Sequence, residues 1–479
     1  MNIKFIQSYD IVIFGAKGDL SCRKLIPALY QLEKKKILNQ KIRIIGVGRA
    51  NWNNKEYAKK VFKALNKFCN EPIDIKIWNI FKKKLHFCNV DVTNLKDFFL
   101  LKMILSQLIN IKIYYFAMPP NTFNNICKGL GSINYNNKPH RIIVEKPIGT
   151  SLASSKETNQ QLRKYFQEEQ IFRIDHYLGK ETILNLLALR FTNPIFYNIW
   201  NNTTIEAIKI TVAEQVGIEG RWKYFNQIGQ TRDMVQNHLL QILSLITMSQ
   251  PKKLNANCIR EKKIKVLKSL KKIKLKDISK NTIRGQYTTG VINGKLATSY
   301  LNEKGSDKNS DIETFVLIKA NIDNKMWKGV PFYLKTGKRL KSKKSEIVIY
   351  FKNIPNSVFK KNLNDNYKNK LIIRLEPNEG IEIQFFNKMP DINSNYKLIN
   401  SKLNFNYTSI IKNKISDAYE RLLLESMKND QSLFVSQEEI ETSWEWIDSI
   451  INSWKLNNMK VQLYPSGTWG PDFSNKNIK

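Results

Sequence analysis

The segment DIVIFGAKGDLSCRK, residues 10–24, decides the fold of the N-terminal part of this chain. It opens with a continuous apolar run, which is typical of a strand buried on both faces, and continues at helical spacing. Gly15 and Gly18 lie between the two, where a tight backbone turn lets the first amide groups of a helix face a phosphate. Their spacing is GxxGxx rather than GxGxxG, so a glycine-rich turn without a ligand stays an alternative.

Strand-like and helix-like segments alternate up to about residue 175. Helical stretches such as KEYAKKVFKALNKF (55–68) separate apolar runs, which read KIRIIGVG (41–48), LHFCNVDV (85–92), IKIYYFAM (111–118) and HRIIVEKP (140–147). This rhythm predicts a doubly wound parallel sheet, an α/β Rossmann-like nucleotide-binding domain over residues 1–175.

Strands follow one another across short turns in the rest of the chain. They read IEAIKITVAEQV (205–216), ETFVLIKANID (313–323), SEIVIYF (345–351), LIIRLEP (371–377) and GIEIQFF (380–386). Such strands favour an antiparallel sheet, and helical segments frame them. Residues 176–479 are therefore predicted to form an α+β domain with a large antiparallel sheet.

The composition is that of a globular protein. A chain of 479 residues normally forms two domains, and its 42% apolar residues suffice to fill two cores. No run approaches the roughly 18 apolar residues of a membrane span, and the N-terminus shows no cleavable signal, so we expect a cytoplasmic protein with no membrane partner. The five cysteines show no CxxC or zinc-ligand spacing, which predicts reduced thiols and no metal.

The formal net charge of +37 makes nucleic-acid binding an alternative function. The lysines, however, accompany asparagine and isoleucine along the whole length, which indicates a general compositional drift. Aromatic residues are not interleaved with the basic runs, and no RNP or helix-turn-helix motif occurs. We therefore expect no nucleic-acid partner.

Two basic residues follow strands of the predicted nucleotide-binding domain. In GVGRA (46–50), Arg49 stands where an NAD-specific site usually has an acid for the ribose hydroxyls, so NADP is the expected coenzyme. Lys146 follows the strand of HRIIVEKP, and ligands of open parallel sheets bind beyond the carboxyl ends of the strands. The alternative for Lys146 is an ordinary surface lysine before the turn-forming Pro147.

The segment RIDHYLGKE (173–181) places an acid, a histidine, a tyrosine and a lysine close together in a chain with four histidines. In a regular strand the side chains of Asp175 and His176 point to opposite faces, so we expect them to have different tasks. Lys180 begins a helix after Gly179, and the lysine and the first helical amides form a positive terminus that suits a phosphate.

A second polar cluster lies in RDMVQNHLLQIL (232–243), at helical spacing. The expected buried stripe consists of Val235, Leu239, Ile242 and Ile246, and the polar side of Asp233, Asn237, His238 and Gln241. The polar side either faces water or lines a site for a polar ligand. Hydride transfer from an alcohol needs a base for the hydroxyl proton, and His238 with its tautomer fixed by Asp175 can form one. His86 and His140 lie beside predicted strands, without a cluster of polar residues around them, and are expected to have a structural role.

A further basic element is VPFYLKTGKRLKSKK (330–344), where Lys338 and Lys343 follow a strand and a Thr-Gly turn. In a chain this rich in lysine they can be ordinary surface residues. If they converge on a phosphate, they complement Lys180 and His176.

Together these motifs resemble the glucose-6-phosphate dehydrogenase family over nearly the whole chain. The resemblance rests on GAKGDLSCRKLIPALY, EKPIGTSL, RIDHYLGKE, ALRFTNPIF, AEQVGIEGRWKYF, GQTRDMVQNHLLQIL, GVPFYLKTGKRL, DAYERLLLESM and GTWGP, in family order. It implies oxidation of D-glucose 6-phosphate at C1 to 6-phospho-D-glucono-1,5-lactone with NADP+ as hydride acceptor, the first step of the oxidative pentose phosphate pathway. It also implies a homodimer or homotetramer associated through the large-sheet domain.

The resemblance assigns roles to individual residues. His238 matches the family's proton acceptor, and Asp175 matches the acid that orients it. The substrate-binding positions are Lys146, His176, Tyr177, Lys180, Glu214, Asp233, Lys338 and Lys343. The coenzyme positions are Gly15, Ala16, Lys17, Gly18, Asp19, Leu20, Lys24, Arg49, Asp91, Val92 and Lys146.

The chain departs from the family pattern at Lys17, Ser21 and Lys335, where a small hydroxyl residue, alanine and arginine are common. Lys17 can add a contact to a coenzyme phosphate. A sugar oxidoreductase of the glucose-fructose type is the main enzymatic alternative, since it also joins a nucleotide fold ending in EKP to an antiparallel sheet. RIDHYLGKE together with NHLLQ favours the dehydrogenase.

Overall fold

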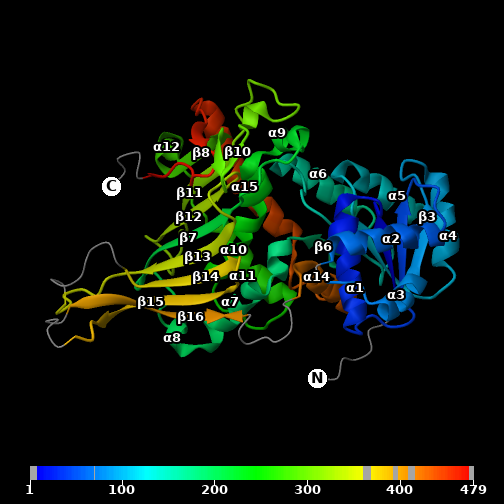
Figure 1. The fold of residues 1–479 in the computed structure, drawn as a ribbon, viewed down its shortest axis with the longest axis horizontal. Coiled ribbons are helices and arrows are strands. Elements are labelled where there is room, and N and C mark those ends of the chain that lie inside the picture. The colour runs from blue at the N-terminus through cyan, green and yellow to red at the C-terminus, as the bar shows by residue number, and fades with distance from the viewer. Residues whose placement is uncertain (1–7, 70, 360–367, 392–396, 408–415, 474–479) are drawn as a thin grey trace. The chain divides into compact units, whose positions relative to one another are not determined.

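The apolar run of residues 9–14 forms strand β1 (Tyr9–Phe14), and all its residues are buried. Figure 1 shows the fold in the computed structural model of the chain. The structure describes residues 8–69, 71–359, 368–391, 397–407 and 416–473. Two compact units make up the chain. The first consists of Met1–Gly179, Pro251–Glu261 and Ser416–Glu441, and the second of Lys180–Gln250, Lys262–Ile415 and Thr442–Lys479. No sequence pattern predicted that two later segments would belong to the first unit.

Seven described strands form the sheet of the first unit, in the order β17-β6-β5-β4-β1-β2-β3. The strands after β1 are β2 (Arg43–Gly48), β3 (Leu85–Asn89), β4 (Ile111–Phe116), β5 (Arg141–Val144), β6 (Ile171–Ile174) and β17 (Phe434–Val435). All neighbours pair in parallel except β17, which is antiparallel to β6. The strand order reverses between β1 and β4, and ligands of such sheets bind beyond the carboxyl ends there. The predicted doubly wound sheet is confirmed.

Helices cover both faces of this sheet. Those on one face share a core with alternate residues of β1, and they are α1 (Ile26–Lys34), α2 (Asn54–Phe68), α3 (Ile75–Phe81) and α14 (Ala418–Lys428). The other face packs against α4 (Phe98–Leu105) and α5 (Phe123–Ser132), and α6 (Leu152–Arg163) lies beside α5. The ring of Phe98 lies 6.3 Å from that of Phe14 between centroids, and Phe123 lies 5.4 Å from Phe116. Both faces of β1 are therefore buried, as its apolar sequence requires.

A buried charged cluster lies at the amino ends of β1, β2 and β4. Arg43 donates through Nε and Nη2 to the two carboxylate oxygens of Asp10, at 2.9 and 2.7 Å. Lys112 Nζ lies 2.8 Å from the same carboxylate, and Asn110 donates to it at 2.9 Å. Burial alone would raise the pKa of Asp10, but these donors stabilise the charged form and hold the pKa below its usual value.

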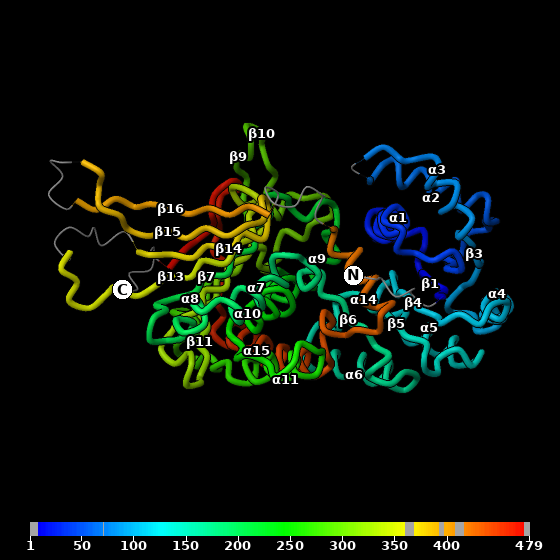
Figure 2. Tube along the Cα trace, turned by 90° about the horizontal axis from the view of Figure 1, so that it is seen from below, coloured from blue at the N-terminus to red at the C-terminus, as the bar shows by residue number. Residues whose placement is uncertain are grey.

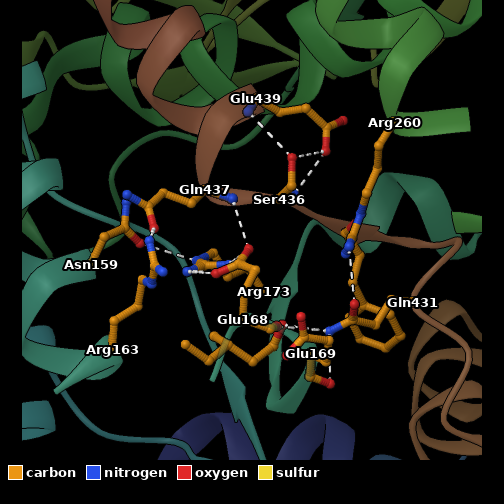
Figure 3. Close-up of polar contacts among 12 residues, drawn as sticks. Asn159, Arg163, Glu168, Glu169, Arg173, Arg260, Gln431, Ser436, Gln437 and Glu439 are labelled. Carbon is orange, nitrogen blue, oxygen red and sulfur yellow. Dashed lines mark hydrogen bonds and ion pairs between the residues drawn. The ribbon is translucent and has the colours of Figure 1, made fainter. Parts of the chain in front are cut away.

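A polar network attaches the later segments of the first unit to β6 (Figure 3). The buried guanidinium of Arg173 donates to both carboxylate oxygens of Glu168, at 2.7 and 2.9 Å, and to Asn159 at 3.1 Å. The amide of Gln431 donates to backbone carbonyls of residues 168, 169 and 171, and its oxygen accepts from Arg260 at 3.0 Å. Segment 416–441 is thus bonded to the strand that leads to Asp175, and segment 251–261 is linked to it through Gln431.

Nine described strands form the sheet of the second unit, in the order β16-β15-β14-β13-β7-β12-β11-β8-β18. Figure 2 shows β16, β15, β14 and β13 following one another in this row. The strands are β7 (Ile205–Ala213), β8 (Thr282–Thr288), β11 (Phe315–Asn321), β12 (Pro331–Gly337), β13 (Lys344–Phe351), β14 (Lys370–Glu376), β15 (Gly380–Lys388), β16 (Leu398–Asn406) and β18 (Gln462–Pro465). A separate hairpin contains β9 (Gly290–Ile292) and β10 (Lys295–Ala297).

The predicted large antiparallel sheet is confirmed with one correction. Six of its eight pairings are antiparallel, but β7 pairs in parallel with β12, and β8 with β18. The parallel β7–β12 pair arises because more than a hundred residues of chain separate these neighbours, enough for a crossover connection.

A buried helical segment runs through the second unit, from π-helical turns (Thr231–Leu239) into α10 (Leu240–Thr247). Three side chains bind the last carbonyls of α10. Arg190 donates to those of Leu245 and Met248, Trp200 to that of Ile246 and Trp327 to that of Thr247, all within 2.6–2.8 Å. The position of this helix is therefore fixed by specific hydrogen bonds as well as by packing.

The second unit contains further helices. They are α7 (Glu181–Thr192), α8 (Pro194–Tyr197), α9 (Trp222–Gln230) and α12 (Ile278–Asn281), with α11 (Ala256–Lys268) and α15 (Gln437–Leu456) shared between the units. None of the helices in the described parts of the chain has the length and apolar character that crossing a membrane requires.

We predict that Asp10→Asn destabilises the first unit strongly, because it leaves Arg43 and Lys112 buried without a full counter-charge. The expected loss is about 3–5 kcal/mol at pH 7, measured by denaturant unfolding. Since the folded-state pKa of Asp10 is depressed, its contribution is present above the unfolded-state pKa and disappears as the pH falls through the folded-state value.

The difference between wild type and Asp10→Asn should therefore shrink below about pH 4. Asp19→Asn is the matched control, because Asp19 pairs with Arg23 at 2.6 Å on the surface of the same unit. That change should cost less than about 1 kcal/mol. Equal effects of the two substitutions would contradict the prediction.

Candidate active site

The turn after β1 has the geometry that a phosphate-binding loop needs. Gly15 has φ +86°, and a Cβ there would lie 2.3 Å from the carbonyl oxygen of Ala117, so only glycine fits. The amides of Gly15 and Ala16 donate to the carbonyl of Val47, at 3.0 and 3.2 Å, and Gly18 donates to that of Gly15 at 2.9 Å. Helical structure begins at residue 19, so the first helical amides follow directly on this turn.

Basic and aromatic side chains gather beyond β2. Arg49 is exposed there, and the ammonium groups of Lys17 and Lys60 each lie 5.7 Å from the ring centroid of Trp52. Hydrogen bonds from Thr93 hold the pKa of Asp91 below its usual value, with a smaller contribution from Arg49. The structure thus brings the predicted Lys17, Arg49 and Asp91 to one part of the first unit, together with a tryptophan that was not predicted.

The residue before the predicted Lys146 belongs to a buried cluster. Glu145 accepts a hydrogen bond from the hydroxyl of Tyr115, and burial raises the pKa of its carboxyl. Tyr419 of α14 also bonds this carboxylate. The carboxylate of Glu145 is therefore bonded to two tyrosines. These bonds hold the backbone next to Lys146, just after the end of β5.

The prediction that Asp175 and His176 alternate on a strand is wrong. Strand β6 ends at Ile174, and residues 176–179 form a 3-10 turn. Asp175 is buried, and its Oδ1 accepts from the backbone N–H of Tyr177 at 3.0 Å, which stops the strand. The two residues are separated by this turn rather than by strand alternation.

Helix α14 packs against the 3-10 turn of residues 176–179. The ring of His176 stacks on that of Tyr419, with centroids 6.3 Å apart and planes 12° apart. Asp417, at the start of α14, lies 3.1 Å from Lys24 Nζ. Of the predicted residues, His176, Tyr177 and Lys24 thus lie around the beginning of one helix from the C-terminal part of the chain.

In the second unit the helix with His238 is more deeply buried than its polar residues suggest. The predicted stripe of Val235, Leu239, Ile242 and Ile246 is confirmed as buried. His238 and Gln241 are also buried, whereas Asp233 and Asn237 are half-buried. The water-facing alternative is therefore wrong for His238.

The local winding differs from the predicted α-helix. Residues 231–239 form a π-helix, with more residues in each turn, and such segments occur frequently at functional sites. Thr231 anchors the segment by donating to Glu313 at 2.6 Å, and Gln230 donates to Thr336 of β12 at 2.8 Å.

Glu214 and Lys338 form an ion pair at the carboxyl ends of neighbouring strands. Glu214 follows β7, Lys338 follows β12, and the last residues of these parallel strands are paired in register. Lys338 Nζ lies 2.7 Å from Glu214 Oε2, and the lysine side chain is 3% exposed. Two predicted substrate residues from positions 124 apart thus come together.

Lys180 and Lys343, also predicted substrate residues, converge on Glu376. Lys180 precedes α7 and bonds Glu376 Oε1, and Lys343 Nζ lies 2.9 Å from Oε2. Burial would raise the pKa of Glu376, but the two lysines outweigh it and hold the pKa below its usual value. Two ammonium groups that converge on one anionic group can also bind a phosphate ester.

Three residues at these positions were missed by sequence reasoning. Trp52 lies three residues after Arg49, and its aromatic character is a signal that was available. Tyr419 belongs to DAYERLLLESM, which was quoted only as a likeness to the family. Glu376 lies 196 residues from Lys180, and no local pattern connects them.

Comparisons with known proteins agree with this architecture. The family model "Glucose-6-phosphate dehydrogenase, NAD binding domain" matches residues 12–185, and "Glucose-6-phosphate dehydrogenase, C-terminal domain" matches residues 187–479. The first of these indicates a nicotinamide coenzyme.

Relatives match the chain over its full length. Glucose-6-phosphate 1-dehydrogenase of Buchnera aphidicola subsp. Schizaphis graminum is 56% identical over 479 residues, covering 100% of this chain and 98% of the relative. That of Dickeya dadantii is 52% identical, covering 97% of this chain and 95% of the relative. A solved glucose-6-phosphate dehydrogenase in complex with its substrate glucose-6-phosphate superposes with TM-score 0.90 at 33% identity, covering 99% of this chain and 98% of that one. The chain therefore belongs to the glucose-6-phosphate dehydrogenase family of oxidoreductases.

Proposed function

We propose that this protein oxidises D-glucose 6-phosphate at C1 to 6-phospho-D-glucono-1,5-lactone, with NADP+ as hydride acceptor, as the first step of the oxidative pentose phosphate pathway. The observation that carries the proposal is the convergence of Lys180 and Lys343 on one anionic group, in a chain that belongs to this family. Residues 1–175 bind the coenzyme, and residues 176–479 bind the sugar phosphate and associate two or four subunits in the cytoplasm.

The residues at the end of the parallel sheet fit a dinucleotide. The turn at residues 15–20 suits the pyrophosphate, because Gly15 leaves no side chain there and helical amides follow. Lys17 and Arg49 supply positive charge for the 2′-phosphate that distinguishes NADP from NAD. Lys24, Asp91, Val92 and Lys146 complete the proposed coenzyme contacts, together with Ala16, Gly18, Asp19 and Leu20.

The proposed chemistry needs one proton acceptor. His238 takes the proton of the C1 hydroxyl as the hydride leaves C1, and Asp175 orients the imidazole and stabilises its charged form. When bound, the nicotinamide supplies the hydride acceptor. Burial of both residues supports the assignment, since a dry setting strengthens the interaction of a carboxylate with an imidazolium.

The substrate contacts divide into a phosphate part and a sugar part. His176, Tyr177, Lys180 and Lys343 hold the phosphate. Glu214, Asp233 and Lys338 hold the sugar hydroxyls, and Lys146 reaches both the sugar and the coenzyme. The ion pair between Glu214 and Lys338 supports this division, because it presents a fixed acceptor and a fixed donor side by side.

The test is the absorbance of reduced nicotinamide in the presence of glucose 6-phosphate. We expect reduction of NADP+ with the 6-phosphate and little with glucose. Activity on glucose alone would favour an oxidoreductase of the glucose-fructose type. Salt-dependent DNA binding without NADP+ reduction would favour a nucleic-acid-binding protein.

His238→Asn should lower kcat by about 10²- to 10⁴-fold with little change in the KM for glucose 6-phosphate, because it removes the base and keeps the size of the side chain. Steady-state kinetics measures both constants. His86→Asn is the control, since His86 lies outside the proposed site, and its kcat should stay within about twofold. Near-normal turnover of His238→Asn would show that the base is assigned wrongly.

Lys180→Ala should raise the KM for glucose 6-phosphate by about 10- to 100-fold and leave the KM for NADP+ nearly unchanged, because a charge-assisted bond to the phosphate is lost. Lys343→Ala should act in the same direction. Lys341→Ala, an exposed lysine of the same basic run, is the matched control and should change neither constant. An equal effect of all three substitutions would indicate a general loss of positive charge instead.

Arg49→Ala should raise the KM for NADP+ by about tenfold or more while leaving that for NAD+ nearly unchanged, because only NADP+ carries the 2′-phosphate. The ratio of kcat/KM for the two coenzymes reports the effect, with NAD+ as the internal control. A parallel rise in both KM values would mean that Arg49 does not read the 2′-phosphate.

A further inference from the structure

Glu376 lies between the two lysines that the proposed function assigns to the substrate phosphate. It is the last residue of β14, and its two carboxylate oxygens each bind one ammonium group, Oε1 that of Lys180 and Oε2 that of Lys343. A phosphate monoester uses two of its oxygens in the same way when it binds two lysines. The acid therefore makes the contacts that the substrate phosphate has to make.

The backbone aims Glu376 at this position through an irregularity of the sheet. Strands β13 and β14 pair regularly up to Glu346, but Ser345 then pairs with Glu376 rather than with Leu375. Such a β-bulge inserts an extra residue and redirects the neighbouring side chain. The contact is a feature of the strand geometry, not of one flexible side chain.

The three side chains differ in their exposure to solvent. The exposed fraction of the side chain is 10% for Lys180, 29% for Glu376 and 65% for Lys343. An anion from solution can therefore approach from the side of Lys343, while Lys180 is held against the acid.

Because both are negatively charged, the carboxylate of Glu376 and a phosphate compete for the same two lysines. The depressed pKa of Glu376 keeps its carboxylate ionised at neutral pH, where a phosphate monoester carries about −1.5 to −2 charges. Each ammonium group has three N–H donors and can bind two anions at once. Two anions held by the same ammonium groups repel each other, however, and partial burial weakens the screening by solvent.

We propose that Glu376 is an internal counter-ion of the phosphate subsite, which competes with the substrate phosphate, and with inorganic phosphate, for Lys180 and Lys343. It balances part of the lysine charge in the absence of substrate and yields its partners when a phosphate binds. The acid thus sets the KM for the sugar phosphate without taking part in hydride transfer. This inference rests on the proposed function and deepens it.

The test is Glu376→Gln, which keeps the size of the side chain and removes its charge. The KM for glucose 6-phosphate and the inhibition constant of inorganic phosphate should both fall by at least about threefold, because less repulsion opposes the incoming phosphate. The kcat should stay within about twofold. A purely structural role of Glu376 does not lower both constants at unchanged kcat.

Glu379→Gln is the matched control. Glu379 lies three residues after Glu376, between β14 and β15, and accepts a hydrogen bond from Thr182 Oγ1 of α7 at 2.8 Å, which glutamine can also accept. The control removes one negative charge near the same helix start without touching the lysines, so both constants should stay at their wild-type values. Thermal unfolding of each variant checks that it is folded.

An unchanged or raised KM in Glu376→Gln would overturn the inference, and a raised KM would show that the acid positions the lysines. If the wild-type protein does not reduce NADP+ with glucose 6-phosphate, the proposed function fails. Calorimetric titration of inorganic phosphate into wild type and Glu376→Gln then decides the counter-ion inference by itself. Tighter binding by the variant supports it, and equal or weaker binding overturns it.

Discussion

Parallel pairing of strands is the constraint on which the candidate site depends, because it brings the carboxyl ends of neighbouring strands to one edge. In the first unit, β1, β2 and β5 all end there. Gly15 and Arg49 follow β1 and β2 directly, and Lys146 follows β5 after one residue. In the second unit, the parallel strands β7 and β12 also end in register. If β12 ran antiparallel to β7, Glu214 and Lys338 would lie at opposite ends of the strand pair, roughly 20 Å apart. One of the two parallel pairings in this mainly antiparallel sheet therefore creates the Glu214–Lys338 pair.

The two edges of the first sheet carry charge in different ways. At the amino ends, Asp10 is fully buried, and three donors saturate its carboxylate, which is how a fold tolerates a charge in its interior. At the carboxyl ends, Arg49 is exposed and Asp91 is bonded mainly to Thr93. Saturated charges stabilise a fold and have no capacity for a ligand. Charges at an exposed edge contribute little to stability and can bind one.

The strand-turn-helix at residues 10–24 and the class of both sheets could be predicted, since apolar periodicity and glycine spacing are local properties of the chain. Local periodicity predicted the wrong structure at Asp175. The carboxylate of Asp175 accepts the N–H of Tyr177, and the strand therefore ends at Ile174. It also missed the π-helical winding around His238, which preserves an apolar stripe much as an α-helix does. The return of residues 416–441 to the first unit depends on Arg173, Glu168 and Gln431, and such long-range polar bonds leave no periodic trace in the sequence.

Because basic residues outnumber acidic ones in this chain, the lysines that do have an acid partner are the informative ones. With 78 lysines and arginines against 41 aspartates and glutamates, the chain has too few acids to give each basic residue a partner of its own. A buried lysine gains more from an acid partner than an exposed one does, because an ammonium group without a counter-charge loses its hydration at high cost. Lys338 and Lys180, whose side chains are 3% and 10% exposed, both have a glutamate partner at a sheet edge, whereas Lys341 stays exposed. A lysine retained in the interior at this cost marks a place where positive charge serves more than solubility. In such a place the acid that makes the lysine tolerable is also the group that an anionic ligand has to replace.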